Sequence, residues 1–439
     1  MGFVVYNGNM ESDNRQNIQP DLNMETELVG AEELNKKSRM WLYMIGVVLG
    51  AAVVAGLVFA VLRVLNPVGE GTGVANNTTS ENSKNTVKKK NTELISDTVT
   101  VEVDGHTIAY NGAYVVNGIE AEISSGTYES VMDDQAVFLV IGGGSLKIDG
   151  EVTIKKSGSA EFDGRGDDYS FHGMNSAIVV VGEGSSVSIN GATITTDVSG
   201  ANAVVATNNG VAEVANSTIT TSQDNSRGLH ATYGGSINAD NVSITTQGGS
   251  SASLATDRGE GTVVASNAKL ATAGAGSPLI YSTGVITVTN SEGTATGAQI
   301  AVVEGKNSVN LQGCKFSANG VGNRGSVDNA GVMIYQSMSG DAKEGVGSFT
   351  ATDSVLTVLE SSSVYAETPF FFVTNTEATI DLTGATISFS PAAKFIKAVG
   401  TNEWGEPGVN GGKVTANMSE TEATNTETEV DEISSVTGI

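Results

Sequence analysis

The sequence is short of cysteine, histidine and positive charge, and each shortage excludes a class of function. Cys314 is the only cysteine among 439 residues, which excludes an internal disulfide framework and a cysteine-based zinc or iron–sulfur site. The three histidines lie far apart in the chain and leave little room for histidine–metal chemistry. Lysine and arginine total 23 against 49 acidic residues, so the net charge is −26. Because nucleic-acid binding depends on cationic side chains that neutralise phosphates, DNA and RNA partners are excluded.

Aromatic residues are also scarce, at 5% of the chain, and only two of them are tryptophans. Sugar-binding grooves present aromatic rings to the apolar faces of sugars, so the sequence shows no broad carbohydrate-stacking surface. The remaining aromatic candidates are Tyr281, Tyr335, Tyr365 and the three phenylalanines at 370–372. The phenylalanines are expected to supply one or two core side chains.

One apolar segment is long enough to cross a membrane. It begins at Trp41, ends at Leu62 and contains 22 residues without a charge, and a helix of that length rises ~33 Å against a bilayer core of ~30 Å. A cleavable signal peptide would have a shorter apolar region and small residues at its cleavage site. Lys36, Lys37 and Arg39 precede the segment, so the positive-inside rule predicts a cytoplasmic N-terminus and an extracellular remainder.

Composition divides the chain into five parts. Residues 1–40 are polar and acidic and are expected to form a cytoplasmic tail, and 41–65 contain the transmembrane helix. Residues 66–97 contain too little apolar surface to offset their ordering entropy, which predicts a flexible stalk. A β-rich region follows at 98–415. Residues 416–439 form an acidic C-terminal segment with room for one last strand.

A short phrase recurs along the β-rich region, as in GATIT, NSTIT, NVSIT and NAKLA. The apolar anchors of the copies are, in order, Ile194, Ile219, Ile244, Leu270, Phe316, Leu356 and Ile387. The first four anchors lie 25, 25 and 26 residues apart. NSEGT, at 290–294, is a degraded copy, and it divides the gap before Phe316 into two shorter turns.

Three residues before each anchor position stands a residue that tolerates a left-handed backbone, as a sharp recurring corner requires. These predicted corner residues are Gly191, Asn216, Asn241, Asn267, Asn290, Gly313, Asp353 and Gly384. Short strands joined by tight corners at a fixed period predict a coil that stacks on itself, with aliphatic side chains inside and Ser or Thr outside. The predicted fold is all-β: a parallel β-helix preceded by a single transmembrane helix.

The repeat resembles the right-handed parallel β-helix of pectin-lyase-like bacterial surface proteins. More narrowly, the phrases TDRGEG (256–261), TNTEATIDLTGATIS (374–388) and WGEPGVNGG (404–412) are similar to those of uncharacterised β-helical exoproteins of Gram-positive gut bacteria. The resemblance covers roughly 100–415. It implies a fold and an extracellular setting, and it implies little about activity.

Enzymes of this architecture that cut acidic polysaccharides share short motifs, and none of these motifs is intact here. Polygalacturonase-like hydrolases resemble one another in Asn-Thr-Asp, an Asp-Asp pair, Gly-His-Gly and Arg-Ile-Lys, whereas pectate-lyase-like enzymes need an aspartate cluster for calcium and a basic catalytic residue. The candidate basic residues, none of them beside clustered acids in the sequence, are Arg227, Arg258, Lys269, Lys306 and Lys315. The sequence therefore predicts no catalytic residue, although fold alone does not decide function.

Two further features are candidate sites. Asp163, Asp167 and Asp168 lie within six residues and could wrap one Ca²⁺, which prefers several oxygen ligands in a flexible loop, although the loop lacks EF-hand spacing and a solvated loop is the simpler interpretation. Outward threonines at 193–195, 218–220 and 243–245 would form a flat Thr array that resembles an ice-binding face, but β-propensity alone favours threonine there.

These observations predict a membrane-anchored bacterial cell-surface β-helix without enzymatic activity, which acts as an adhesin-like or envelope interaction module and binds a glycan or a protein. A polysaccharide lyase or glycoside hydrolase acting on an acidic polysaccharide stays open as the main alternative, and an ice-binding Thr array as a minor one. No cofactor is expected apart from the candidate calcium ion.

Overall fold

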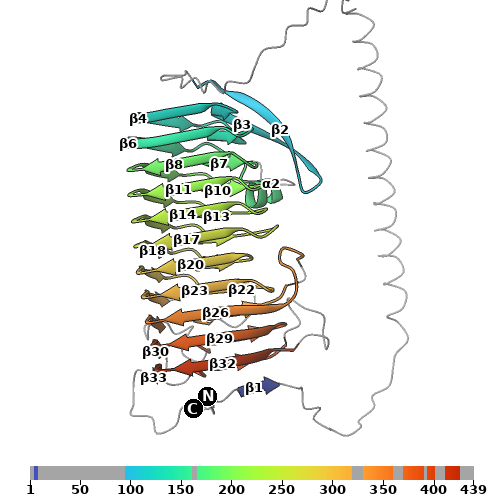
Figure 1. The fold of residues 1–439 in the computed structure, drawn as a ribbon, viewed down its shortest axis with the longest axis vertical. Helices are drawn as coiled ribbons and strands as arrows, with labels where there is room; N and C mark the ends of the chain where they lie inside the picture. The colour runs from blue at the N-terminus through green and yellow to red at the C-terminus, as the bar shows by residue number, and fades with distance from the viewer. Residues whose placement is uncertain are drawn as a thin grey trace, which may run out of the picture. The chain divides into compact units, whose positions relative to one another are not determined.

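The described part of the chain is a coil of stacked parallel strands. The computed structural model describes residues 94–160, 166–318, 330–337, 339–358, 369–389, 393–400 and 411–425, together with the backbone of 4–7. Figure 1 shows the stack running from β2, drawn in blue, to β33, drawn in red. The fold is therefore a parallel β-helix, which confirms the solenoid prediction.

Each turn from β7 onward contributes three short strands, one to each of three ladders. The first ladder belongs to a twelve-stranded sheet, in which only the β2–β3 pair is antiparallel. Its strands are β2 (Asp97–Val103), β3 (His106–Asn117), β5 (Gln135–Ile141), β7 (Ile178–Val181), β10 (Val204–Thr207), β13 (Leu229–Ala231), β16 (Leu254–Thr256), β19 (Ile280–Ser282), β22 (Ala301–Glu304), β25 (Val332–Tyr335), β28 (Phe371–Thr374) and β31 (Ile396–Ala398).

The other two ladders are joined into one sheet because the long β6 pairs with both β8 and β9. The second ladder contains β4 (Glu120–Ser130), β6 (Ser145–Lys156), β8 (Ser186–Asn190), β11 (Val211–Ala215), β14 (Ser236–Asp240), β17 (Thr262–Ser266), β20 (Val285–Thr289), β23 (Ser308–Gln312), β26 (Val346–Thr352), β29 (Glu377–Thr383) and β32 (Lys413–Ser419). The third contains β9 (Thr193–Thr196), β12 (Thr218–Thr221), β15 (Ser243–Thr246), β18 (Lys269–Thr272), β21 (Glu292–Ala295), β24 (Lys315–Ala318), β27 (Val355–Val358), β30 (Thr386–Phe389) and β33 (Glu422–Asn425).

The predicted anchors stack on one another inside the third ladder. Ile219 pairs in register with Ile194 on one side and Ile244 on the other, and all three are buried. The degraded copy occupies its expected place, because Gly293 lies between Leu270 and Phe316 in the same column. The repeat period therefore corresponds to one turn of the coil. The stack reaches Asn425, and its last strand, β33, lies in the C-terminal segment for which the sequence left room for one strand.

The corners between the second and third ladders use the left-handed backbone. All eight predicted corner residues have a positive φ, from 49° at Asn216 to 83° at Gly191. Their side chains also bridge the turns: the Asn216 amide donates to Asn190 Oδ1 at 2.8 Å, and the Asn241 amide donates to Asn216 Oδ1 at 2.7 Å. Asparagine therefore satisfies both the backbone requirement of the corner and its own hydrogen bonds.

The interior of the coil is apolar, and so are two patches on the outer face of the first ladder that other side chains cover. Phe370 and Phe371 belong to the main core, whereas Phe372 packs outside the coil with Val302 and Met333. Cys314 is buried in the main core, so it is a small packing residue.

The outer face of the first ladder is covered near its beginning. The β2–β3 hairpin contributes Tyr110 and the short helix α2 (Gly166–His172) contributes Tyr169 to an apolar cluster with Leu139 and Val205 on that face. The cover extends past β10, because Thr232 donates to the Phe171 carbonyl oxygen at 2.7 Å and the outward His230 is fully buried.

The membrane prediction is not addressed by the described residues. No helix among them is long and apolar enough to cross a bilayer, and the predicted span from Trp41 to Leu62 lies outside the described residues. Near the N-terminus, β1 (Val4–Asn7) pairs antiparallel with β32, with Val5 opposite Thr415.

Candidate functional site

A cleft opens on the outer face of the first ladder, over the turns from β13 to β25. In this face one column of outward side chains runs through His230, Ala255, Tyr281, Val302 and Met333. His230 and Ala255 are fully buried, whereas Tyr281 of the same column lines the cleft. The cleft has a volume of about 230 Å³.

The walls of the cleft come from segments far apart in the sequence. Phe171 comes from α2, Arg227 from the connection before β13, Asp257 from the residue after β16, and Asp341 from the connection between β25 and β26. The coil brings the middle two together because they lie on adjacent turns.

Asp257 and Arg227 form a buried ion pair at the base of the cleft. Their side chains are 4% and 11% exposed, and Arg227 Nη2 lies 3.3 Å from Asp257 Oδ2. His230 Nε2 lies 3.8 Å from the same oxygen, which is longer than a hydrogen bond. Burial lowers the pKa of His230 to about 4, so the imidazole is neutral at pH 7. Within the described residues Arg227 Nη1 and both His230 ring nitrogens are buried without a hydrogen-bond partner.

Glu304 lies two turns further along and is held by hydroxyl groups. Tyr281 and Tyr335 donate to its Oε2 at 2.6 and 2.8 Å, and Ser337 donates to its Oε1. Glu304 is almost fully buried. Burial raises the pKa of the Glu304 carboxyl above its ordinary value, while these hydrogen bonds oppose part of the rise. Asp257, which lines the cleft, lies against a guanidinium, whereas Glu304 is buried against neutral hydroxyls, two of which belong to the cleft-lining Tyr281 and Tyr335.

Arg258 contacts two residues that line the cleft, Phe171 and Asp341. Its Nη2 and Nε lie 2.6 and 3.1 Å from Asp341 Oδ1, and its Nη1 lies 3.3 Å from Asp167 Oδ2. The guanidinium carbon lies 3.9 Å from the centroid of the Phe171 ring, a cation–π contact. One side chain thus joins α2 to the connection between β25 and β26.

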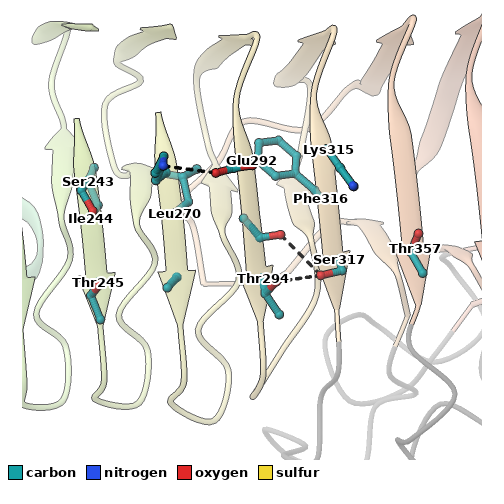
Figure 2. A pocket seen from close by; sticks show the side chains of 13 residues that line it. Ser243, Ile244, Thr245, Leu270, Glu292, Thr294, Lys315, Phe316, Ser317 and Thr357 are labelled. Carbon is teal, nitrogen blue, oxygen red and sulfur yellow. Dashed lines mark hydrogen bonds and ion pairs between the residues drawn. The ribbon is translucent and has the colours of Figure 1, made fainter. Parts of the chain in front are cut away.

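A second depression lies on a different face, over the third ladder from β15 to β27 (Figure 2), with a volume of about 500 Å³. Gly293, the residue without a side chain in the anchor column, is one of its lining residues. Lys269 pairs with Glu292 on its rim at 3.5 Å, and Figure 2 shows Thr294 beside Ser317, to which it is hydrogen-bonded at 2.8 Å. Both charged side chains are more than half exposed, and such pairs contribute little. We therefore consider the smaller, charged cleft the better candidate site.

The sequence-predicted acidic site is only partly described. Asp163 lies outside the described residues, so the calcium loop stays a prediction. Asp167 and Asp168 are in the first turn of α2, and Asp167 pairs with Arg258. Among the described residues no group of three or more histidine, cysteine or acidic side chains could hold a metal ion.

The threonine columns are aligned as expected. Thr218 pairs with Thr193 and Ser243, and Thr220 with Thr195 and Thr245. Ice binding remains untested by this alignment.

Sequence reasoning missed the cleft. Arg227 and Arg258 have no clustered acids beside them in the sequence, but the fold pairs each with a carboxylate that is distant in sequence. Tyr281 and Tyr335 were candidate aromatic residues and do line the cleft. The available signal was TDRGEG at 256–261, a dense charged phrase between two apolar strands that contains Asp257 and Arg258.

The chain matches no protein-family model, and no curated protein matches it in sequence. The fold is therefore assigned from the repeat and the strand pairings.

Proposed function

We propose that this chain is a bacterial cell-surface protein of the right-handed, pectin-lyase-like type, and that it binds a glycan in the cleft. The observation that carries the proposal is the combination, in one hollow, of two tyrosine rings with a buried Arg227–Asp257 pair whose Nη1 has no partner among the described residues. Rings pack against sugar faces, and charged groups at the base exchange hydrogen bonds with sugar hydroxyls. A surface protein that binds a glycan in this cleft without cleaving it would act as an adhesin.

The binding test uses the full-length chain in a detergent without a sugar headgroup, applied to immobilised neutral and acidic oligosaccharides. We expect retention on at least one of them, and we expect Tyr335→Ala to weaken binding about tenfold because a stacking ring is lost. Tyr128→Ala is the matched control, since Tyr128 is also half-buried but lies on β4. Equal loss in both variants, or no retention on any glycan, contradicts the proposal.

Glycoside hydrolysis is the second candidate, and the pair of carboxyl groups favours it. Burial raises the pKa of Glu304, which is the character of a general acid, and Asp257 is the other carboxyl group of the candidate pair. The turn of β19 separates them, which puts their backbones roughly 10 Å apart. Shortened oligosaccharides in the same incubations, abolished by Glu304→Gln, would establish it.

We further propose that residues 41–62 anchor the chain in the membrane once, with the N-terminus in the cytoplasm. The β1–β32 pairing requires both strands on the same side of a membrane, so an anchored chain of this topology would not contain it. Protease added to intact cells distinguishes the two arrangements. We expect cleavage in the coil region and protection of an N-terminal tag, and removal of the tag from intact cells would refute this topology.

A further inference from the structure

His230 is a buried histidine on the outer face of the coil. It belongs to β13 and pairs in register with Val205 and Ala255. Val205 packs in the apolar cluster outside the first ladder, and residues paired in register point to the same side of a sheet. His230 therefore faces outward. It is nevertheless fully buried, so another segment has to cover it.

The helix α2 is attached to this face beside His230. Thr232 lies two residues after His230, and its hydroxyl donates to the Phe171 carbonyl oxygen at 2.7 Å. Asn202 lies one turn earlier, and its side-chain amide donates to the Tyr169 carbonyl oxygen at 3.3 Å. These two hydrogen bonds hold the backbone of α2 on the outer face of the first ladder, which makes α2 the cover.

The coil does not need α2 for its own strand pairings. The helix lies in the connection between β6 and β7, which occupies residues 157–177, whereas the next such connection, between β9 and β10, occupies only 197–203. The strand pairings of the described coil do not include α2. The helix can therefore leave the surface in a local opening while the stacked strands stay paired.

The imidazole of His230 lies among charged groups without a hydrogen bond. Neither of its ring nitrogens has a partner within the described residues. Nε2 lies 3.8 Å from Asp257 Oδ2, which is already paired with Arg227. Burial lowers the pKa of His230 to about 4, with Asp257 opposing the fall and Arg227 adding to it.

The other elements packed around His230 supply few titratable groups. The neighbouring strands β10 and β16 contain none, since their sequences are VVAT and LAT. Arg258 follows Asp257 and pairs with Asp167 and Asp341. The titratable side chains of α2 are Asp167, Asp168, Tyr169 and His172. A proton on His230 would thus meet one paired carboxylate and a nearby guanidinium, with no water to solvate it.

We propose that α2 is an acid-released cover, which protonation of His230 displaces from the outer face of the first ladder. The new cation lies near Arg227 in a site that excludes water, and it gains solvation only when α2 moves away. Ser170 and Phe171 of α2 line the cleft, so release of the helix also removes part of the cleft lining. The inference does not depend on the proposed glycan binding.

The pH window follows from the direction of the pKa shift. An exposed imidazole has an ordinary pKa of ~6.5, and the buried one binds its proton less well. The closed state therefore has its full stability above pH ~6.5 and loses it as the pH falls toward the pKa of about 4. From pH 7.5 to pH 5 the ratio of open to closed molecules should rise at least about thirtyfold.

Hydrogen exchange followed by mass spectrometry measures this opening in the full-length chain, held in a detergent without a sugar headgroup. After correction for the intrinsic effect of pH on exchange, the amides of α2 should exchange at least about thirtyfold faster at pH 5 than at pH 7.5. The amides of β20, in the middle of the coil, should change by less than about threefold. Equal acceleration in both segments, or none in α2, contradicts the inference.

His230→Phe tests the assignment to this histidine, because it keeps a ring in place and loses no hydrogen bond within the described residues. We expect the acid response of α2 to fall about tenfold or more. His172, whose pKa burial also lowers, contributes equally in the wild type and the variant. His106→Gln is the matched control, since His106 is exposed on β3, and it should keep the full response. An undiminished response in His230→Phe overturns the inference.

A direct titration covers the case in which His230→Phe does not fold. Nuclear magnetic resonance of the wild-type chain, labelled with ¹³C in its three histidines, follows each imidazole from pH 8 to pH 4. We expect at least one of them to titrate below pH ~5, well under the ordinary ~6.5. Three midpoints near pH ~6.5 would show that no imidazole is buried in the closed state, and the proposed cover would be refuted.

Discussion

Replacing Gly274 by alanine is expected to destabilise the coil by about 3 kcal/mol or more, the largest effect we anticipate from a single methyl group. A Cβ at Gly274 would lie 1.8 Å from the Gly248 carbonyl oxygen, and a Cβ at Gly248 would lie 2.1 Å from Gln223 carbonyl carbon on the turn before. Backbone meets backbone at this point in consecutive turns, so no side chain can move aside to make room. Because each turn packs only on its neighbours, one displaced turn weakens the stack on both sides.

Urea unfolding followed by circular dichroism measures this effect. Gly411→Ala is the matched control, since a Cβ there meets nothing within 4 Å and its stability should stay within about 0.5 kcal/mol of the wild type. Coincident unfolding curves for the two variants would show that the stacked turns can separate at Gly274.

Arg227→Met is expected to cost about 3 kcal/mol because it leaves the Asp257 carboxylate buried without its partner. The two side chains are 11% and 4% exposed, so water cannot replace the guanidinium. Adding Asp257→Asn removes the uncompensated charge, and the double variant should recover a large part of the loss. Thermal and urea unfolding of the two single variants and the double variant give the coupling free energy.

An exposed ion pair provides the comparison. Lys269→Met breaks the pair with Glu292, whose two side chains are 71% and 61% exposed, and the change should stay below about 0.5 kcal/mol. If Arg227→Met proves equally mild, or if Asp257→Asn does not restore stability, then the pair at the base of the cleft is accessible to water and our account of its burial is wrong.

The coil was predictable from the sequence because every turn repeats the same local environment. Ile194, Ile219 and Ile244 face the same interior position, and Asn216 and Asn241 make the same corner. A local sequence pattern therefore predicted both the number of residues in a turn and the positions of the corner residues. It also predicted the place of the degraded copy at 290–294.

The cleft was not predictable in this way, because its residues are related by stacking. Arg258 is separated from Asp341 by 83 residues, and Arg227 from Asp257 by 30. Their proximity depends on the register of adjacent turns and on where the longer connections fold back. Periodicity identifies residues that recur at the same position in every turn. The residues of the cleft do not recur in this way, so periodicity does not identify them.

The connection between β25 and β26 has a consequence for how such a protein can diversify. It occupies residues 336–345, whereas the corresponding connection between β22 and β23 occupies only 305–307. Despite the difference, Phe316 and Leu356 remain partners in the third ladder. An insertion at one corner can therefore supply a new wall, as Asp341 does here, without disturbing the backbone pairing of the coil. Selection can act on recognition and on folding almost independently, by lengthening one connection while the turns on either side keep their register.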